Sequence, residues 1–197
     1  MPEHFTDAEL VARALKNPDS YGLIIERFEA PLTRYIIRIT RAEHEEVEDI
    51  LQSVFIKAYR SLNGFDTGLK LSSWMYRIAH NACVDFLRKH TRRQHVSLDA
   101  DDEYSQSLLE VIASEENVAL HLTRDEQRWA LKKLVQSLPE KYRTVTILFF
   151  GEDKSYEEIS DILQIPIWTV WTLINRAKKA LFATAQEPQF SHLFTYA

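Results

Sequence analysis

The sequence predicts an all-α protein: two small helical domains joined by an acidic flexible linker, the second being a helix-turn-helix domain. Apolar residues recur at helical spacing through two blocks of the chain, and only 4 of its 197 residues are Gly. Between the blocks, residues 96–120 hold seven acids and neither Lys nor Arg, a composition typical of a solvated linker. We therefore expect domains at 1–94 and 121–197, with the linker at 95–120.

The N-terminal block should begin with two helices. Residues 6–16 start with Thr6 and Glu9, which form the Thr-x-x-Glu pattern of a capping box. Residues 20–39 are rich in apolar side chains and form the second helix. We expect Pro31 to kink this helix or divide it in two, because proline lacks the N–H that the helical hydrogen-bond ladder needs.

A third helix, over residues 43–62, has the clearest amphipathic pattern. The apolar stripe that should face a core consists of Val47, Ile50, Leu51, Val54, Phe55, Ala58, Tyr59 and Leu62. The opposite face presents Glu45, Asp49, Gln52, Ile56 and Arg60. Asn63 and Gly64 are typical of a turn and should end the helix.

The fourth helix should run from about Ser72 to Lys89. Its buried stripe consists of Trp74, Met75, Ile78, Ala82 and Phe86. Its other face presents Ser73, Arg77, His80, Asn81, Val84 and Arg88, and it leads into the basic run RKHTRR, which ends with Arg92 and Arg93. Such a face suits a surface that follows a nucleic-acid strand, and it suits a solvated helix face equally well.

In the C-terminal block, SYEEISDIL and IPIWTVWTLINRAKKAL read as the two helices of a helix-turn-helix, the second being the recognition helix over 165–181. The expected buried stripe of the recognition helix is Ile167, Val170, Ile174, Ala177 and Leu181. The expected outward face is Trp168, Trp171, Thr172, Asn175 and Lys179. Two exposed indoles form an apolar patch of the kind that marks a contact site.

Composition limits the function classes. The net charge of −5 argues against simple coating of nucleic acid, although the two signs are segregated along the chain. A single cysteine suits a reducing cytosol. No apolar run approaches the ~18 residues of a membrane helix, and the N-terminus has no export-signal pattern. We expect a cytoplasmic protein that does not insert into membranes.

An enzyme is the rival class of protein. The chain has no Gly-rich phosphate loop, no His-Glu-x-x-His and no pair of cysteines for zinc. Cys83 and His80 form the one local pairing of a nucleophile with a base, but Cys83 borders the buried stripe of its helix, which favours a packed thiol. We therefore expect no catalytic residue, no metal and no cofactor.

Two segments carry a family resemblance. DILQSVFIKAYRSLNGFD followed by LSSWMYRIAHNACVDFLRK resembles region 2 of the extracytoplasmic-function (ECF) group of bacterial sigma factors, and LPEKYRTVTILFFGEDKSYEEISDILQIPIWTV resembles region 4 of that group. The resemblance covers roughly residues 6–183. It implies a sigma factor that binds core RNA polymerase at the β′ coiled coil and the β flap and directs promoter-specific initiation at −10 and −35 elements. Many relatives are also held inactive by an anti-sigma factor.

The resemblance also implies roles for individual residues. Those of the β′ contact are Asp49, Gln52 and Ile56. At the −10 element, the resemblance implies a base pocket formed by Phe65 and Asn81 and a strand contact by His80. The residues that should hold phosphates there are Arg77, Arg88, Arg92 and Arg93. Those of the −35 element are Trp168, Trp171, Thr172, Asn175, Arg176, Lys178 and Lys179. Trp74 is better explained as a core residue than as a stacking platform, because its spacing matches Ile78 and Ala82.

The recognition helix departs from the family pattern Ile-Pro-x-Gly-Thr-Val-(Lys/Arg)-Ser-Arg. Trp168 stands where a small residue is usual, Trp171 where a basic one is, and Leu173 where an Arg is. Three interpretations stay open. The helix still enters the −35 groove, with weaker or different specificity; the two indoles dock on a protein or on region 2; or the chain is a variant with altered −35 reading.

The alternative function, the acidic linker and the C-terminal tail remain to be considered. The alternative function is a helix-turn-helix regulator that does not act through core polymerase, although such proteins usually carry a ligand or dimer domain. The acidic linker resembles the segment that runs through the polymerase toward the RNA exit path. The tail after Ala183, with Phe190, Phe194 and Tyr196, either packs back on region 4 or meets a partner.

Overall fold

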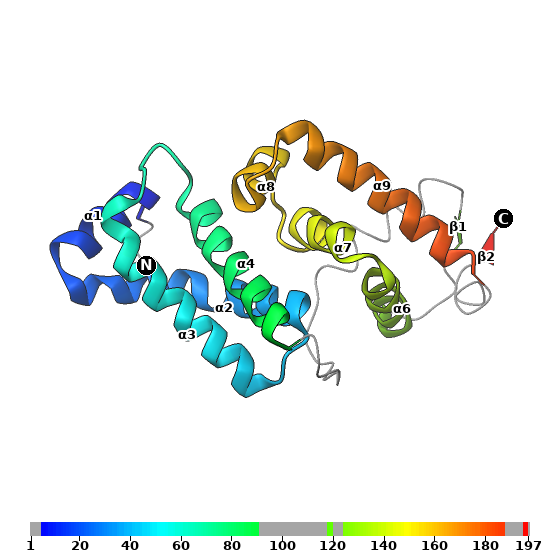
Figure 1. Cartoon of the computed structure of the whole chain (residues 1–197), viewed down its shortest axis with the longest axis horizontal. Coiled ribbons are helices and arrows are strands. Elements are labelled where there is room, and N and C mark those ends of the chain that lie inside the picture. The colour runs from blue at the N-terminus through cyan, green and yellow to red at the C-terminus, as the bar shows by residue number, and fades with distance from the viewer. Residues whose placement is uncertain (1–4, 91–117, 120–123, 188–194, 197) are drawn as a thin grey trace. The chain divides into compact units, whose positions relative to one another are not determined.

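The computed structural model describes residues 5–90, 118–119, 124–187 and 195–196 (Figure 1). Contact clustering divides the chain into two compact units, and each is described here by itself. The first unit contains helices α1 to α4, and the second contains α6, α7, α9 and most of α8. The predicted class, all-α with two helical domains, is confirmed. Apart from residues 118–119, the predicted linker lies outside the described residues, as do Arg92 and Arg93.

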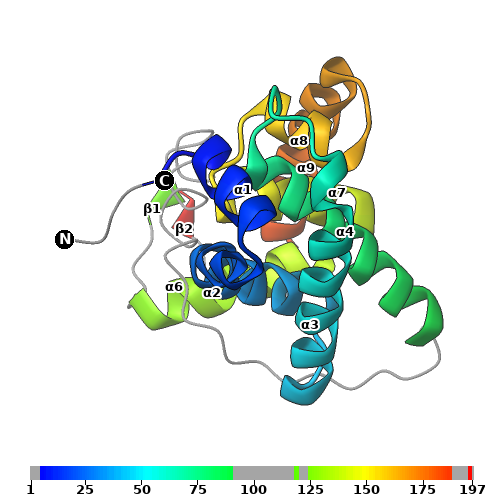
Figure 2. The same ribbon diagram turned by 90° about the vertical axis from the view of Figure 1, so that its left-hand side faces the viewer.

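Within residues 5–90, the first unit packs helices α1, α2, α3 and α4, which Figure 2 labels, and has two short 3₁₀ turns. Its elements are α1 (Asp7–Lys16), a 3₁₀ turn (Pro18–Tyr21), α2 (Gly22–Thr40), α3 (His44–Ser61), a second 3₁₀ turn (Leu62–Gly64) and α4 (Leu71–His90). The predicted capping box at the start of α1 is confirmed. The Glu9 N–H donates to Thr6 Oγ1 at 3.3 Å, and the Thr6 N–H donates to Glu9 Oε2 at 2.8 Å.

Helix α2 is continuous through Pro31, so of the two expected outcomes, a kink or a division, the division is wrong. Proline removes the N–H that would donate to the Arg27 carbonyl, which is the loss of one bond in a 19-residue helix. Residues on both sides of Pro31 hold the helix against the core, because Ile24, Leu32 and Ile36 are each 0% exposed. Tertiary burial therefore outweighs the local break.

The predicted buried stripe of α3 is confirmed at Val47, Ile50, Val54, Phe55 and Ala58. Tyr59 is a correction, because its side chain is exposed and meets Tyr21 only edge-on. Ser73 of α4 is a second correction, since it was expected on the polar face and is buried. Helix α4 packs against both α2 and α3, so the buried arc is wider than one amphipathic stripe.

The second unit carries the helix-turn-helix. Its elements are α6 (Arg124–Ser137), α7 (Glu140–Thr146), a π-helical turn (Ile147–Gly151), α8 (Tyr156–Leu163), α9 (Ile167–Ala185) and the two-residue strands β1 (Val118–Ala119) and β2 (Thr195–Tyr196). The strands pair antiparallel, so the end of the tail joins the end of the predicted linker. Phe190 and Phe194 lie outside the described residues.

The predicted core stripe of α9 is confirmed at Val170, Ile174, Ala177 and Leu181, all at most 1% exposed. Ile167 is a correction, because it is 45% exposed. It is the first residue of α9, directly after Pro166, and the buried surface begins one turn later. None of the described helices combines the length and the apolarity that a bilayer crossing needs.

Candidate functional site

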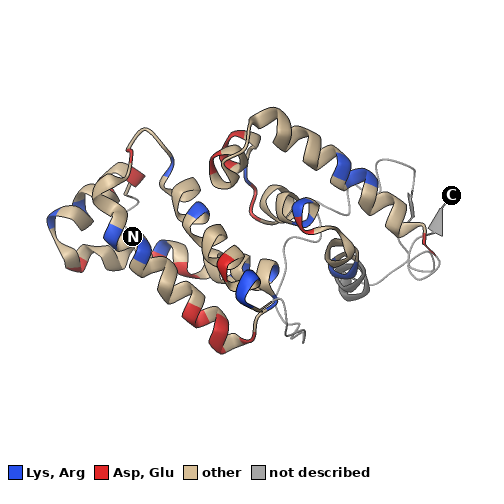
Figure 3. Ribbon diagram, viewed as in Figure 1, with Lys and Arg blue, Asp and Glu red and all other residues tan. Residues whose placement is uncertain are grey.

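One exposed face of α3, here called the α3 face, carries Asp49, Gln52 and Ile56. These residues are spaced by three and four positions, so they lie one above another on the helix. Ile56 is 45% exposed, which is high for an isoleucine. Acidic residues also gather on the first turns of α3 (Figure 3). A carboxylate, an amide and an apolar side chain in one row suit a partner surface that offers a positive charge, a hydrogen-bonding group and an apolar contact.

A second strip follows α4. Arg77, Asn81 and Arg88 recur at spacings of four and seven, so they share one side of this helix. Asn81 and Arg88 are exposed, and Arg77 is half-buried. The last turn adds exposed Lys89, and Figure 3 shows basic residues at this end of the helix. Guanidinium groups flanking an exposed amide can hold phosphates while the amide contacts a base edge.

His80 is placed differently from the sequence expectation. It was expected on an exposed face, and that is wrong: it is half-buried. Its Nδ1 lies 3.0 Å from the hydroxyl oxygen of Tyr35, which is fully buried and stacked edge-on against Tyr76. The side of α4 that carries His80 turns toward α2. This contact was invisible in the sequence because the two residues are 45 positions apart.

Phe65 is also turned inward. It is 8% exposed, and its ring centroid lies 5.2 Å from that of Trp74, which is itself buried as predicted. The loop after Phe65 is a turn in which Asp66 Oδ1 accepts a hydrogen bond from the Gly68 N–H at 2.9 Å. Phe65 therefore anchors the start of this loop, here called the 65–70 loop, while Asp66, Thr67 and Lys70 face the solvent.

The helix-turn-helix is shaped by local bonds. Ser155 caps α8: the Glu158 N–H donates to its Oγ at 3.2 Å, and the Ser155 N–H donates to Glu158 Oε2 at 3.0 Å. The Ser-x-x-Glu pattern would have predicted this capping box. Gln164 takes the left-handed conformation, φ 55°, in the turn between α8 and α9. The Ser160 hydroxyl then donates to the Ile165 carbonyl at 2.6 Å.

The outward face of α9 starts with two indoles. Trp168 is 68% exposed and Trp171 is 58% exposed, as predicted. Thr172 and Asn175 follow and are half-buried. The Thr172 hydroxyl donates to the Trp168 carbonyl at 2.8 Å, and the Asn175 amide donates to the Trp171 carbonyl at 3.0 Å. The amide oxygen of Asn175 remains an acceptor, and one of its N–H groups remains a donor.

The cations of α9 lie in its C-terminal half. Arg176 and Lys179 are exposed, and Lys178 is half-buried, with its Nζ 5.9 Å from the ring centroid of Phe150. The outward face of α9 is thus divided into an apolar N-terminal part and a cationic C-terminal part. In a groove, the second part can meet phosphates while the first meets base edges or methyl groups.

The described residues include neither a reactive thiol nor a group of side chains suited to a metal ion. Cys83 is fully buried, and burial raises the pKa of its thiol to about 12. Such a thiol is a packed apolar group and not a nucleophile. In the part of the chain that the structure describes, no cluster of His, Cys, Asp and Glu could hold a metal ion.

A basic helix in one unit and a helix-turn-helix in the other define a two-domain DNA-binding protein. The family description Sigma-70 region 2 matches residues 24–93, and Sigma-70 region 4 matches residues 128–181. Two relatives identify the group. The chain is 36% identical to ECF RNA polymerase sigma factor SigW of Bacillus subtilis over 171 residues, 83% of this chain and 87% of that one. It is 32% identical to ECF RNA polymerase sigma-E factor of Escherichia coli K12 over 186 residues, 92% of this chain and 95% of that one.

The chain therefore belongs to the ECF RNA polymerase sigma factors. The fold agrees. The sigma factor RpoE of Bartonella quintana, solved with the anti-sigma factor NepR, has a TM-score of 0.63 and 20% identity, over 85% of this chain and 98% of that one.

Proposed function

We propose that this protein binds core RNA polymerase through the α3 face and directs it to promoters. The observation that carries the proposal is the exposed row of Asp49, Gln52 and Ile56 in the unit that matches region 2. By analogy with the family, the partner of this face is the β′ coiled coil, and the partner of the second unit is the β flap. The protein acts as a binding factor and not as an enzyme, and it works in the cytoplasm with the polymerase.

Promoter reading is divided between the two units. In the first, Asn81 contacts a −10 base, and Arg77 and Arg88 hold phosphates, together with Arg92 and Arg93 beyond the described residues. Phe65 and His80 support this surface from inside, since both side chains are largely covered. This assignment is supported by the position of Arg77, Asn81 and Arg88 on one side of α4.

In the second unit, the outward face of α9 binds the −35 duplex. Asn175 contacts a base, while Arg176, Lys178 and Lys179 hold phosphates. Trp168, Trp171 and Thr172 cover the groove floor, where indoles can lie against thymine methyl groups. An anti-sigma factor, as in the Bartonella complex, is a further partner that we propose for this chain.

The test is transcription by core polymerase with and without this protein, followed by mapping of the start sites. The double variant Asp49→Lys, Gln52→Ala should lower core affinity at least tenfold, because a charge-assisted contact is reversed in sign. Glu29→Lys, at an exposed position on α2, is the matched control and should bind core normally. Unchanged core affinity of a folded double variant would contradict the assignment. Specific promoter binding by the protein without core polymerase would favour the alternative function, a helix-turn-helix regulator that does not act through the polymerase.

A further inference from the structure

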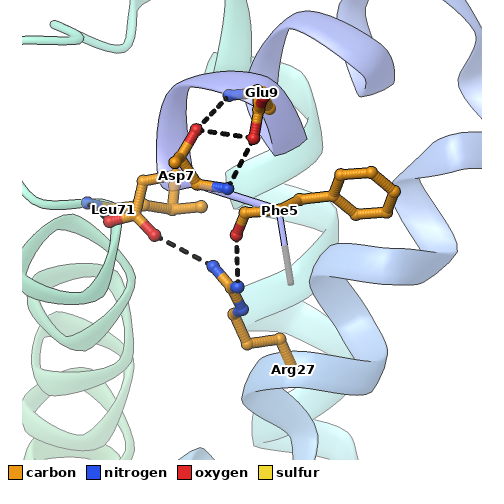
Figure 4. A network of polar contacts seen from close by, with 6 residues as sticks. Phe5, Asp7, Glu9, Arg27 and Leu71 are labelled. Carbon is orange, nitrogen blue, oxygen red and sulfur yellow. Dashed lines mark hydrogen bonds and ion pairs between the residues drawn. The ribbon is translucent and has the colours of Figure 1, made fainter. Parts of the chain in front are cut away.

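The carboxylate of Asp7 joins three helices. Asp7 is the first residue of α1, and Thr6 and Glu9 already cap that helix, so the Asp7 side chain is not needed there. Its Oδ1 lies 3.0 Å from Arg27 Nη1 of α2. Its Oδ2 accepts a hydrogen bond from the Leu71 N–H, the first amide of α4, at 2.9 Å (Figure 4). Asp7 and Leu71 are 64 positions apart in the sequence.

Asp7 supplies a helix cap from a distance. The first amides of an α-helix lack partners within the helix, and a side chain at the preceding position usually satisfies one of them. Before α4 that position is Lys70, whose ammonium group can donate hydrogen bonds but cannot accept one from a backbone N–H. The negative charge of Asp7 takes over the role and also complements the positive end of the α4 dipole.

Arg27 fixes the Asp7 carboxylate. Its Nη1 contacts Asp7, and its Nη2 donates to the Phe5 carbonyl at 2.6 Å, so one guanidinium holds both the side chain and the chain before it. The Phe5 ring lies under Arg13, whose guanidinium carbon is 3.9 Å from the ring centroid. The Asp7 and Arg27 side chains are only about one-third exposed, 39% and 33%, so solvent screens the pair partly.

The 65–70 loop ends where Asp7 acts. Phe65 anchors the start of this loop through Trp74, the turn at Asp66 shapes its middle, and the bond from Asp7 to Leu71 fixes its end. Leu71 is also fully buried. Both the loop and the α4 strip with Asn81 therefore depend on where α4 begins, and a carboxylate outside this segment sets that position.

We propose that Asp7, held by Arg27, is a positioning residue for −10 recognition: it fixes the start of α4 and the end of the 65–70 loop so that the promoter strand meets a preformed surface. The proposal rests on the function proposed above. It assigns to α1 a role in DNA opening, although α1 itself need not touch DNA. Loss of one charge-assisted bond should reduce −10 engagement about tenfold.

The first measurement uses the full-length chain alone. Amide exchange of Leu71, followed by NMR, should accelerate about tenfold in Asp7→Ala, because the cap bond is lost. Glu29→Ala removes an exposed acid of the neighbouring helix and should leave the exchange of Leu71 unchanged. Asp7→Asn keeps an acceptor for the Leu71 N–H and should fall between native and Asp7→Ala. Native exchange rates in Asp7→Ala would overturn the proposal whatever the protein does with polymerase.

The second measurement uses the holoenzyme on a promoter mapped with the unmodified protein. Asp7→Ala should open the −10 region about tenfold less, by permanganate reactivity of unpaired thymines, with core affinity unchanged. The preference for the native −10 single strand over one with a substituted base should also fall, which a general loss of stability would not cause. Asp7→Asn should give values between those of the native protein and Asp7→Ala for promoter opening and for base preference.

Thr6→Ala separates positioning from stability, because it removes the cap of α1 and leaves the Asp7 carboxylate in place. Thr6→Ala and Asp7→Ala are compared under conditions in which the two variants have the same thermal stability. If Thr6→Ala then impairs opening and base preference as much as Asp7→Ala does, Asp7 has only a structural role and the proposal fails. It also fails if Asp7→Ala opens the promoter as Glu29→Ala does. If the unmodified protein supports no transcription, the proposed function fails instead, and the exchange of Leu71 alone decides whether Asp7 fixes α4.

Discussion

Restoring the family pattern in α9 should change how −35 binding depends on salt. The variant is Trp168→Gly, Trp171→Lys, Leu173→Arg, which adds two cations to a segment, residues 165–175, that has no charged side chain. The two tryptophans are 68% and 58% exposed, and the buried stripe of α9 is untouched, so the fold should persist. The Lys at position 171 would lie on the outward face of α9, and the Arg at position 173, where Leu173 is half-buried, would stand where the family pattern has an Arg.

The magnitude follows from counterion release. Each phosphate contact contributes a slope of about −0.9 to the logarithm of affinity against the logarithm of salt concentration, so two contacts contribute about −1.8. Over a fourfold rise in salt, from about 50 to about 200 mM, the affinity of the variant should fall roughly tenfold more than that of the native holoenzyme. At the lower concentration the variant should bind more tightly.

The assay is fluorescence anisotropy of a labelled −35 duplex from a mapped promoter, titrated with holoenzyme at several salt concentrations. Trp168→Gly alone is the control, because it removes an indole and adds no charge; its salt slope should match the native one. Equal slopes for the triple variant and the native protein would refute the reasoning. In that case the outward face of α9 does not meet phosphates at positions 171 and 173.

Two further predictions concern the first unit. Asn81→Ala should lower discrimination at one −10 base by ~1–3 kcal/mol, whereas Arg88→Ala should weaken all promoters alike and flatten the salt dependence; a panel of single-base promoter variants measures both, and uniform weakening by Asn81→Ala would contradict a role in specificity. Burial raises the pKa of Tyr21 to about 12, above its usual 10.0, so the unfolded chain loses this proton first and stability should fall as the pH rises from 10 through 12. Tyr21→Phe removes the 2.8 Å bond from the Tyr21 hydroxyl to the Phe55 carbonyl and should lower the unfolding free energy by about 1 kcal/mol. Tyr21→Phe should also remove the part of the pH dependence of stability that comes from Tyr21. Urea titrations at pH 8 and pH 11 measure this, and an equal fall in unfolding free energy between the two pH values in the native protein and the variant would disprove the assignment.

Local periodicity predicted the helices and their principal faces well. The buried stripe of α3 and the exposure of Asp49, Gln52 and the two α9 indoles follow from spacing alone. On a helix that packs on one side, buried residues recur every three to four positions. The capping box of α1 followed from two residue types at a fixed distance. Their roles toward polymerase and promoter stay predictions.

Periodicity could not predict how wide a buried arc becomes. Ser73 and His80 lie on the side of α4 that a single amphipathic stripe leaves polar, but α4 packs against two neighbours, α2 and α3, so Ser73 is buried and His80 contacts Tyr35 of α2. Ile167 fits the apolar stripe of α9 by its spacing, yet it is exposed, because the buried part of the helix begins only at Val170. Distant polar contacts were equally hidden, since no local pattern links Asp7 to Leu71.

The burial of Cys83 limits how oxidants can act on this protein. Burial raises the pKa of this thiol to about 12, so it stays protonated at neutral pH, and the thiolate is the form that reacts with peroxides and disulfides. The side chain is also fully covered, so reaction would need an opening of the first unit. It is the only cysteine of the chain. A thiol-based signal of oxidative stress must therefore reach this sigma factor through another molecule.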